Sequence, residues 1–337
     1  MDSQYSIIPT LHHCITKEYA MRKYVAILGA ILAVAVVTGL VTGDVRTAEY
    51  KGSKMCGMCH RLMHKEIVEA YETTAHPKGM QKADVEGAIV ADFSTNPAFT
   101  KDKVAYVLGK GRHEQAFLDA DFQVLPAVWD VKAKKWKPKQ AVDGATQCIG
   151  CHSTGYDAAE KTFAEAGIGC EGCHGPGSEH MAGDKTAIVN PKNLDKPKQA
   201  MVCGQCHSAG KDPTGKFAFP VGFRPGDDLT KVLADAKPTA PGPNQQYSEW
   251  LMSKHVAGGT DCAVCHDPHN VTLFLTASKP PGGLPAQVRK PVNDLCLGCH
   301  AATVKDMATH APGAAADATC AACHMHGGQH TFAKTDK

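Results

Sequence analysis

The residues best suited to chemistry in this chain are cysteine pairs followed at once by histidine. The pattern Cys-x-x-Cys-His occurs seven times and uses fourteen of the fifteen cysteines in the 337 residues. Two thiols at this spacing can form thioethers with haem, and the histidine can ligate its iron. The sequence therefore predicts seven covalently bound haem c groups. The predicted thioether residues are Cys56, Cys59, Cys148, Cys151, Cys170, Cys173, Cys203, Cys206, Cys262, Cys265, Cys296, Cys299, Cys320 and Cys323. The predicted proximal iron ligands are His60, His152, His174, His207, His266, His300 and His324.

A disulfide framework or a set of zinc sites is the alternative explanation for so many cysteines. Disulfides do not require a histidine after every pair, and zinc sites usually draw ligands from two separated pairs. Aromatic residues are only 6% of the chain, whereas glycine and proline number 32 and 20. Such a composition is poor for a side-chain core, and flat apolar haems can replace one. We expect a mainly α fold with little regular structure and with haems as its core.

The first 43 residues have the composition of an export signal. Met21-Arg22-Lys23 precedes an apolar run from Tyr24 to Val41, and small residues follow up to Gly43. We expect a leader at 1–43, with Met21 as an alternative start and an uncleaved membrane anchor as the alternative to cleavage. Thioether attachment takes place outside the cytoplasm, so the predicted location is periplasmic or extracellular.

Motif spacing and composition divide the rest of the chain into three parts. Residues 44–210 carry four motifs and 247–337 carry three, and the proline- and glycine-rich stretch 211–246 is the predicted connector. An insert at 85–142 has no motif, and its alternating residues at 104–108 and 122–125 predict strands. A small β-hairpin is expected around 100–140, formed by 128–130 and 135–137. Helical spacing predicts a continuous helix after the first motif that stops at Pro77.

The charge of the chain does not indicate a nucleic-acid partner. The formal net charge is +2 and falls to +1 without the leader, which holds three basic and two acidic residues. Seven oxidised haems, each contributing about −1 with both propionates ionised, would bring the mature protein to roughly −6. Basic residues are scattered, and their one cluster, at 132–137, is expected to be a solvated hairpin edge.

Nine histidines lie outside the motifs and the leader, and seven irons with two axial ligands would need seven of them. His269 is three residues after His266, and His180 is six after His174, too close to cross the same porphyrin. Each is therefore expected to ligate another haem. A continuous helix would hold His76 about 24 Å from His60, so His76 should also serve another haem.

The chain resembles the multihaem cytochrome c family typified by cytochrome c-554. The matching passages are CIGCHSTGYD with GIGCEGCHGPGSEH, FPVGFRPGDDL, YSEWLMSKH before CAVCHDPH, and CAACHM with a following HTF. The resemblance covers most of 49–332 and implies a helical haem-wrapping fold, packed haem pairs and electron transfer. Seven motifs exceed the four of the type member.

The resemblance also suggests which histidines are distal ligands. It implies His76, His180, His255, His269, His310 and His330. His113 completes the set of seven, although it stands in a strand-like segment where a surface histidine is equally ordinary. His64 is expected to pack or contact a propionate, and His330 is preferred to His326.

These features favour an exported electron carrier, without catalytic residues, that works in anaerobic respiration. Its expected partners are redox proteins: a quinol oxidase, other cytochromes or a terminal reductase. One alternative is a reductase of nitrite, hydroxylamine or a sulfur oxyanion at one five-coordinate haem, which would exist if His113 is not a ligand. Another is a homo-oligomer or extracellular haem filament. Membrane contact is expected only through an uncleaved anchor.

Overall fold

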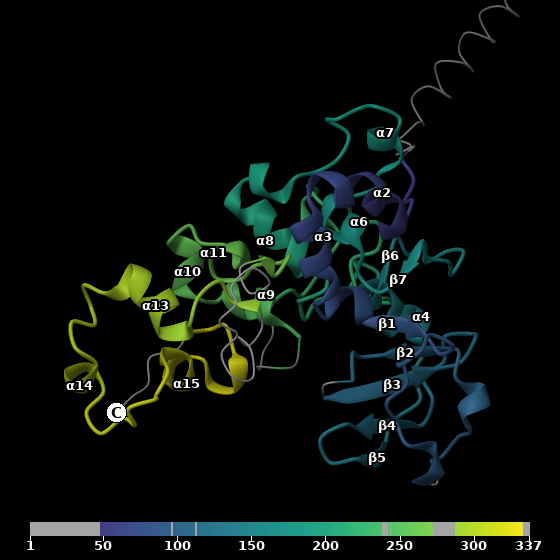
Figure 1. Cartoon of the computed structure of the whole chain (residues 1–337), viewed down its shortest axis with the longest axis horizontal. Helices are drawn as coiled ribbons and strands as arrows, with labels where there is room; N and C mark the ends of the chain where they lie inside the picture. Colours follow the sequence, from purple (N-terminus) through teal and green to yellow (C-terminus); the bar gives the residue numbers. More distant parts are fainter. Residues whose placement is uncertain are drawn as a thin grey trace, which may run out of the picture. The chain divides into compact units, whose positions relative to one another are not determined.

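A computed structural model describes residues 48–95, 97–111, 113–237, 242, 244–271 and 287–332. Residues from Ala48 to Lys337 form one compact unit (Figure 1). The predicted leader, with the alternative of a membrane anchor at 24–41, lies outside the described residues. In the described ranges, no helix is both long enough and apolar enough to cross a membrane.

Every Cys-x-x-Cys-His motif lies on, or at the end of, a helix. The motif helices are α2 (Ser53–Met63), α5 (Ile149–His152), α6 (Cys170–His174), α8 (Lys196–Gly204), α11 (Cys262–Cys265), α13 (Val292–His300) and α15 (Cys320–His324). Most other helices are one or two turns long: α4 (Gly144–Gln147), α7 (Ser178–Met181), α9 (Gln246–Trp250), α10 (Lys254–Ala257) and α14 (Met307–His310), besides α3 (Lys65–Glu72). The prediction of a helical fold with little regular structure is confirmed.

The continuous helix expected after the first motif is wrong. Helix α2 ends at Met63, His64 leaves the helical region with φ −141° and ψ 47°, and α3 starts at the next residue. Helix α3 ends at Glu72, and Pro77 lies in a separate 3-10 turn, His76–Lys78. A one-residue break keeps the apolar spacing of the sequence, so the spacing alone did not reveal it.

The expected hairpin is part of a five-stranded antiparallel sheet whose strands follow in chain order (Figure 1). The strands are β1 (Met80–Lys82), β2 (Tyr106–Leu108), β3 (Glu114–Leu118), β4 (Ala127–Asp130) and β5 (Lys135–Pro138). The hairpin β4–β5 is confirmed, with Trp129 opposite Trp136. The strand expected at 122–125 is wrong: Phe122 has φ 63°, and Val124 makes only an isolated bridge to Leu118. A second ribbon pairs β6 (Ser153–Thr154) with β7 (Glu165–Ala166).

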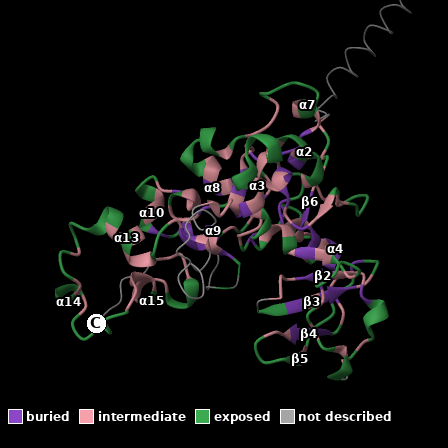
Figure 2. Ribbon diagram, in the orientation of Figure 1, coloured by how far each residue is buried: buried purple, intermediate pink, exposed green. Residues whose placement is uncertain are grey.

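Buried residues of the five-stranded sheet belong to two apolar clusters, and Figure 2 shows buried positions along its strands. Leu118 and Met80 pack with Ile149 of α5, so one face joins the sheet to a motif helix. The other face holds Phe117 and Trp129. By contrast, none of the residues of α13, α14 and α15 is buried by protein. A conventional core thus exists in the insert, whereas the last motif helices have none of their own.

The division of the chain into two haem-bearing regions joined by a connector at 211–246 stays a prediction.

Candidate haem sites

The structure brings six motif histidines close to six histidines from elsewhere in the chain, one to each. The ring centres of each pair are 6.0–6.3 Å apart. The pairs are His60–His180, His207–His76, His174–His269, His300–His255, His266–His330 and His324–His310. The rings are nearly parallel in His174–His269, at 13°, and nearly perpendicular in His300–His255, at 86°.

This spacing fits two axial ligands of one haem iron. An imidazole nitrogen lies about 2 Å from a metal that it ligates and its ring centre about 1 Å further on, so two opposed ligands place their ring centres roughly 6 Å apart. Directly stacked imidazoles, by comparison, lie closer: His60 and His64 on consecutive turns are 5.5 Å apart. The residues present therefore fit the haem groups that the motifs predict.

Each pair joins a motif to a histidine that does not directly follow that motif. His180 faces His60 and not the nearby His174, and His269 faces His174 and not the nearby His266. The structure likewise brings His76 to His207 rather than to His60. These placements match the spacing argument, in which none of these histidines serves the motif just before it.

Hydrogen bonds orient several of the rings. The Nδ1–H of His152 donates to Gly79 O at 3.2 Å and that of His174 to Val189 O at 2.8 Å. His207 Nδ1 donates to Gln246 Oε1 at 2.9 Å. A proton held on Nδ1 leaves the Nε2 lone pair free for a metal. Nothing in the sequence signalled these acceptors, since two of the three are backbone carbonyls.

Burial favours the neutral form of some of the paired imidazoles, which is the form that ligates metals. Burial lowers the pKa of His76 to about 4. It also lowers the pKa of His174 and that of His269. An unpaired buried histidine would be favoured as neutral for the same reason, so burial prepares a ligand without identifying it.

His152 differs from the other six motif histidines. Its Nδ1 is held by Gly79, but within the described ranges no histidine ring faces it. His113, expected to complete the set, is exposed on the turn before β3, where its carbonyl accepts a hydrogen bond from Val131 N at 2.8 Å. The β3–β4 pairing holds it at a strand end, so we leave His113 out of the proposed ligands.

The two remaining histidines, His64 and His326, were not among the predicted distal ligands. His64 is the single residue between α2 and α3, and its ring stacks on that of His60. His326 is exposed in the 3-10 turn His326–Gly328, while His330 takes the place opposite His266.

The motif cysteines also meet across motifs. All fourteen are unbridged. Thiols from different motifs lie close enough to interact in four pairs: Cys56–Cys170, Cys151–Cys206, Cys203–Cys262 and Cys296–Cys320. Cys173 and Cys203, and Cys265 and Cys299, also interact electrostatically across motifs. The cofactor-attaching edges of neighbouring motifs are therefore adjacent.

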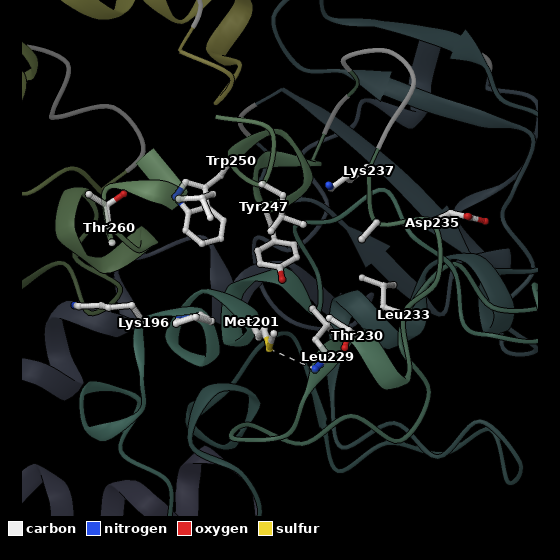
Figure 3. Close-up of a pocket in the computed structure, with 15 residues that line it drawn as sticks. Lys196, Met201, Leu229, Thr230, Leu233, Asp235, Lys237, Tyr247, Trp250 and Thr260 are labelled. Atoms are coloured by element: carbon white, nitrogen blue, oxygen red, sulfur yellow. Dashed lines mark hydrogen bonds between the residues drawn. The ribbon is translucent and has the colours of Figure 1, made fainter. Parts of the chain in front are cut away.

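A cavity of about 630 Å³ is lined by residues of the apolar cluster against which Cys262 of the fifth motif packs (Figure 3). Its wall is mainly apolar and includes Met201, Leu229, Leu233, Tyr247 and Trp250. No motif cysteine or paired histidine is among the described residues that line it. We therefore do not assign it to a haem.

Seven attachment motifs on short helices, with facing histidines, define a multihaem c-type cytochrome. Two family models match the chain. One, described as cytochrome c554 and c-prime, matches residues 110–175, and the other, a doubled CXXCH motif, matches residues 254–305.

Two curated relatives are similar to this chain. The dissimilatory sulfite reductase MccA of Wolinella succinogenes is 25% identical over 228 residues, which are 57% of this chain and 29% of that protein. The multiheme cytochrome MtrA of Shewanella baltica is 24% identical over 186 residues, which are 47% of this chain and 53% of that protein. The chain thus spans about a third to a half of the length of these relatives.

Solved multihaem cytochromes share the fold. The crystal structure of the outer cell wall cytochrome OcwA matches with a TM-score of 0.61 and 23% identity, over 84% of this chain and 79% of that chain. An undecaheme cytochrome from the S-layer of Carboxydothermus ferrireducens matches with a TM-score of 0.55 and 21% identity, over 90% and 55%. The fold expected from the resemblance is confirmed.

Proposed function

We propose that this chain is an exported seven-haem cytochrome that carries electrons along a row of haems in anaerobic respiration. The six facing histidine pairs carry this proposal. Two imidazoles saturate an iron, and a saturated iron cannot bind substrate without losing a ligand. Bound haem supplies one-electron chemistry, and the protein's part is to orient and pack it. The pairs therefore suit transfer between cofactors better than catalysis.

The cysteine contacts suggest the order of the row. In chain order, the first motif meets the third through Cys56 and Cys170, and the fourth meets the fifth through Cys203 and Cys262. The electrostatic contacts connect the third motif to the fourth and the fifth to the sixth, and Cys296 joins the sixth to the seventh. The second motif, which holds His152, meets the fourth through Cys151. It would stand beside the row rather than within it.

Location and partners are proposed from the composition and from the relatives. The apolar run at 24–41 supports export, and so does the similarity to OcwA, an outer cell wall cytochrome, and to a cytochrome from an S-layer. The proposed partners are redox proteins, namely a quinol oxidase, other cytochromes or a terminal reductase. A homo-oligomer or filament is an alternative assembly.

A reductase at the His152 haem is the second candidate. The observation in its favour is that His152 has an oriented ring and, within the described part of the chain, no facing histidine. Its iron would keep one position for a small ligand, which a sulfur oxyanion, nitrite or hydroxylamine could occupy. The similarity to a sulfite reductase adds support, although the chain spans only 29% of that protein.

Electron paramagnetic resonance (EPR) of the purified, oxidised protein separates the candidates, once intact mass has established the number of haems. We expect seven haems, six of them low-spin and one high-spin, with the high-spin signal converting when cyanide is added. Turnover of sulfite or nitrite with a reduced dye would favour the reductase. Seven low-spin haems at every protein concentration would contradict an open His152 haem. Seven that become six on dilution would instead indicate a ligand donated by another subunit.

A further inference from the structure

A buried carboxylate lies at the joint between the first and third motifs. Glu171 is the second residue of the CEGCH motif on α6, and only 1% of its surface is exposed. Both of its oxygens accept a hydrogen bond from Lys51 N at 2.9 Å. Gly52 N donates at 2.6 Å and Gly177 N at 2.7 Å. Three backbone amides thus satisfy the carboxylate.

The Glu171 carboxylate has no cationic partner among the described residues. Lys51 contacts the carboxylate only through its backbone amide, and its Nζ lies 2.6 Å from Glu49 Oε2 instead. Amide dipoles stabilise the ionised form of a carboxylate without removing its charge. A full negative charge therefore remains in a site from which water is excluded, where its field is weakly screened.

This charge is close to the attachment cysteines of two motifs. Lys51 and Gly52 lead directly into α2, which carries the first motif, while Glu171 itself is on α6 with the third. The pKa of Cys56 is raised, first by its hydrogen bond to Cys170, then by burial and by the charges of Cys170 and Glu171. The field of Glu171 thus reaches the point where the two motifs meet.

We propose that Glu171 lowers the reduction potentials of the two haems attached at Cys56–Cys59 and Cys170–Cys173. Reduction adds one electron to an iron, and a fixed negative charge nearby opposes that addition. This inference rests on haem attachment at the two motifs, and it holds for a carrier and for a reductase alike.

The test is an EPR-monitored redox titration of Glu171→Gln. Glutamine is close in size and carries no charge, so two low-spin haems should shift to higher potential while the other haems keep theirs. Exposed Glu86 in the haem-free insert gives a charge control: Glu86→Gln should shift none.

A structural control separates charge from loosening of the joint. Ser53 Oγ donates to Glu165 at 2.8 Å and accepts from Cys170 N at 2.9 Å, so Ser53→Ala weakens the same joint without changing its charge. Equal shifts in Ser53→Ala and Glu171→Gln would overturn the proposal, as would unchanged potentials in a fully haem-loaded Glu171→Gln.

If Glu171→Gln binds fewer haems, a second charge variant tests whether negative charge at this joint lowers the two reduction potentials. Only the backbone amide of Lys51 contacts Glu171, so Lys51→Glu keeps these hydrogen bonds and adds negative charge beside them. At low ionic strength it should move the same two haems to lower potential. No shift, or a shift upward, would overturn the proposal. Haem number is measured separately by mass, so a failure of the seven-haem proposal is distinguishable from this one.

Discussion

Replacing His269 by alanine should open exactly one additional iron. His269 faces His174 at 6.1 Å with the two rings 13° from parallel, and the described residues offer no other histidine ring to take its place. His174 itself stays oriented by Val189 O, so the variant should keep its haem through His174 and the thioethers of the third motif. The defect is thereby confined to one axial position.

The magnitude follows from the number of histidine pairs. With six pairs in the wild type, His269→Ala leaves five. The low-spin EPR intensity should fall from six haems to five. Carbon monoxide bound per reduced chain should rise from one to two, if the wild type binds one at the proposed open His152 haem. Both quantities are measured against total haem, so incomplete loading does not imitate the result.

His113→Ala is the matched control. His113 is exposed, and its backbone contact to Val131 does not involve the ring. Its loss should leave both stoichiometries unchanged. The ligand assignment would be refuted if His269→Ala bound no more carbon monoxide than the wild type, or if His113→Ala bound more.

Three further predictions concern groups around the haem sites. Tyr71 lies 6.4 Å from His76 and 6.1 Å from His269 between ring centres, so Tyr71→Ala should alter the EPR g-values of two haems while Tyr71→Phe preserves them. Phe117→Ala should destabilise the insert by about 3–5 kcal/mol, because the ring is fully buried; urea unfolding followed by tryptophan fluorescence measures this. The pKa of Asp130 is lowered, first by the Ala133 amide and then by Lys137, so Asp130 contributes stability above its unfolded pKa. That contribution is lost as pH falls through the folded pKa, so the melting-temperature gap between wild type and Asp130→Asn should close between neutral pH and about pH 2.

Local chemistry could be predicted from the sequence where it depends on neighbours in the chain. The hairpin between β4 and β5 follows from alternating residues, and both strands form where that alternation occurs. The strand at 122–125 failed because Asp119 Oδ1 accepts from Asp121 N and Gln123 N and fixes a turn, with Phe122 in the left-handed region. Side-chain capping of this kind competes with strand pairing and leaves little trace in hydrophobic patterns.

The candidate sites divide in the same way. Spacing was enough to argue that His180 and His269 do not serve the motifs they follow. It could not identify their partners, because His180 and His60 meet only when segments far apart in sequence fold together. Glu171 carried no signal of its own, since its role depends on amides of Lys51 and Gly52 in a distant segment.

The exchange of histidines between motifs has a consequence for maturation. On the proposed assignments, a chain exported from its N-terminus presents His60 long before His180, and His174 long before His269. By contrast, His207 follows His76, so the iron at His207 can gain its second histidine ligand as soon as its motif emerges. The iron at His266 cannot gain its second ligand until His330 emerges, 64 residues later. Truncation just before His330 would therefore expose an iron whose attachment motif is intact, and protection from external ligands would develop in the order in which the second histidines emerge.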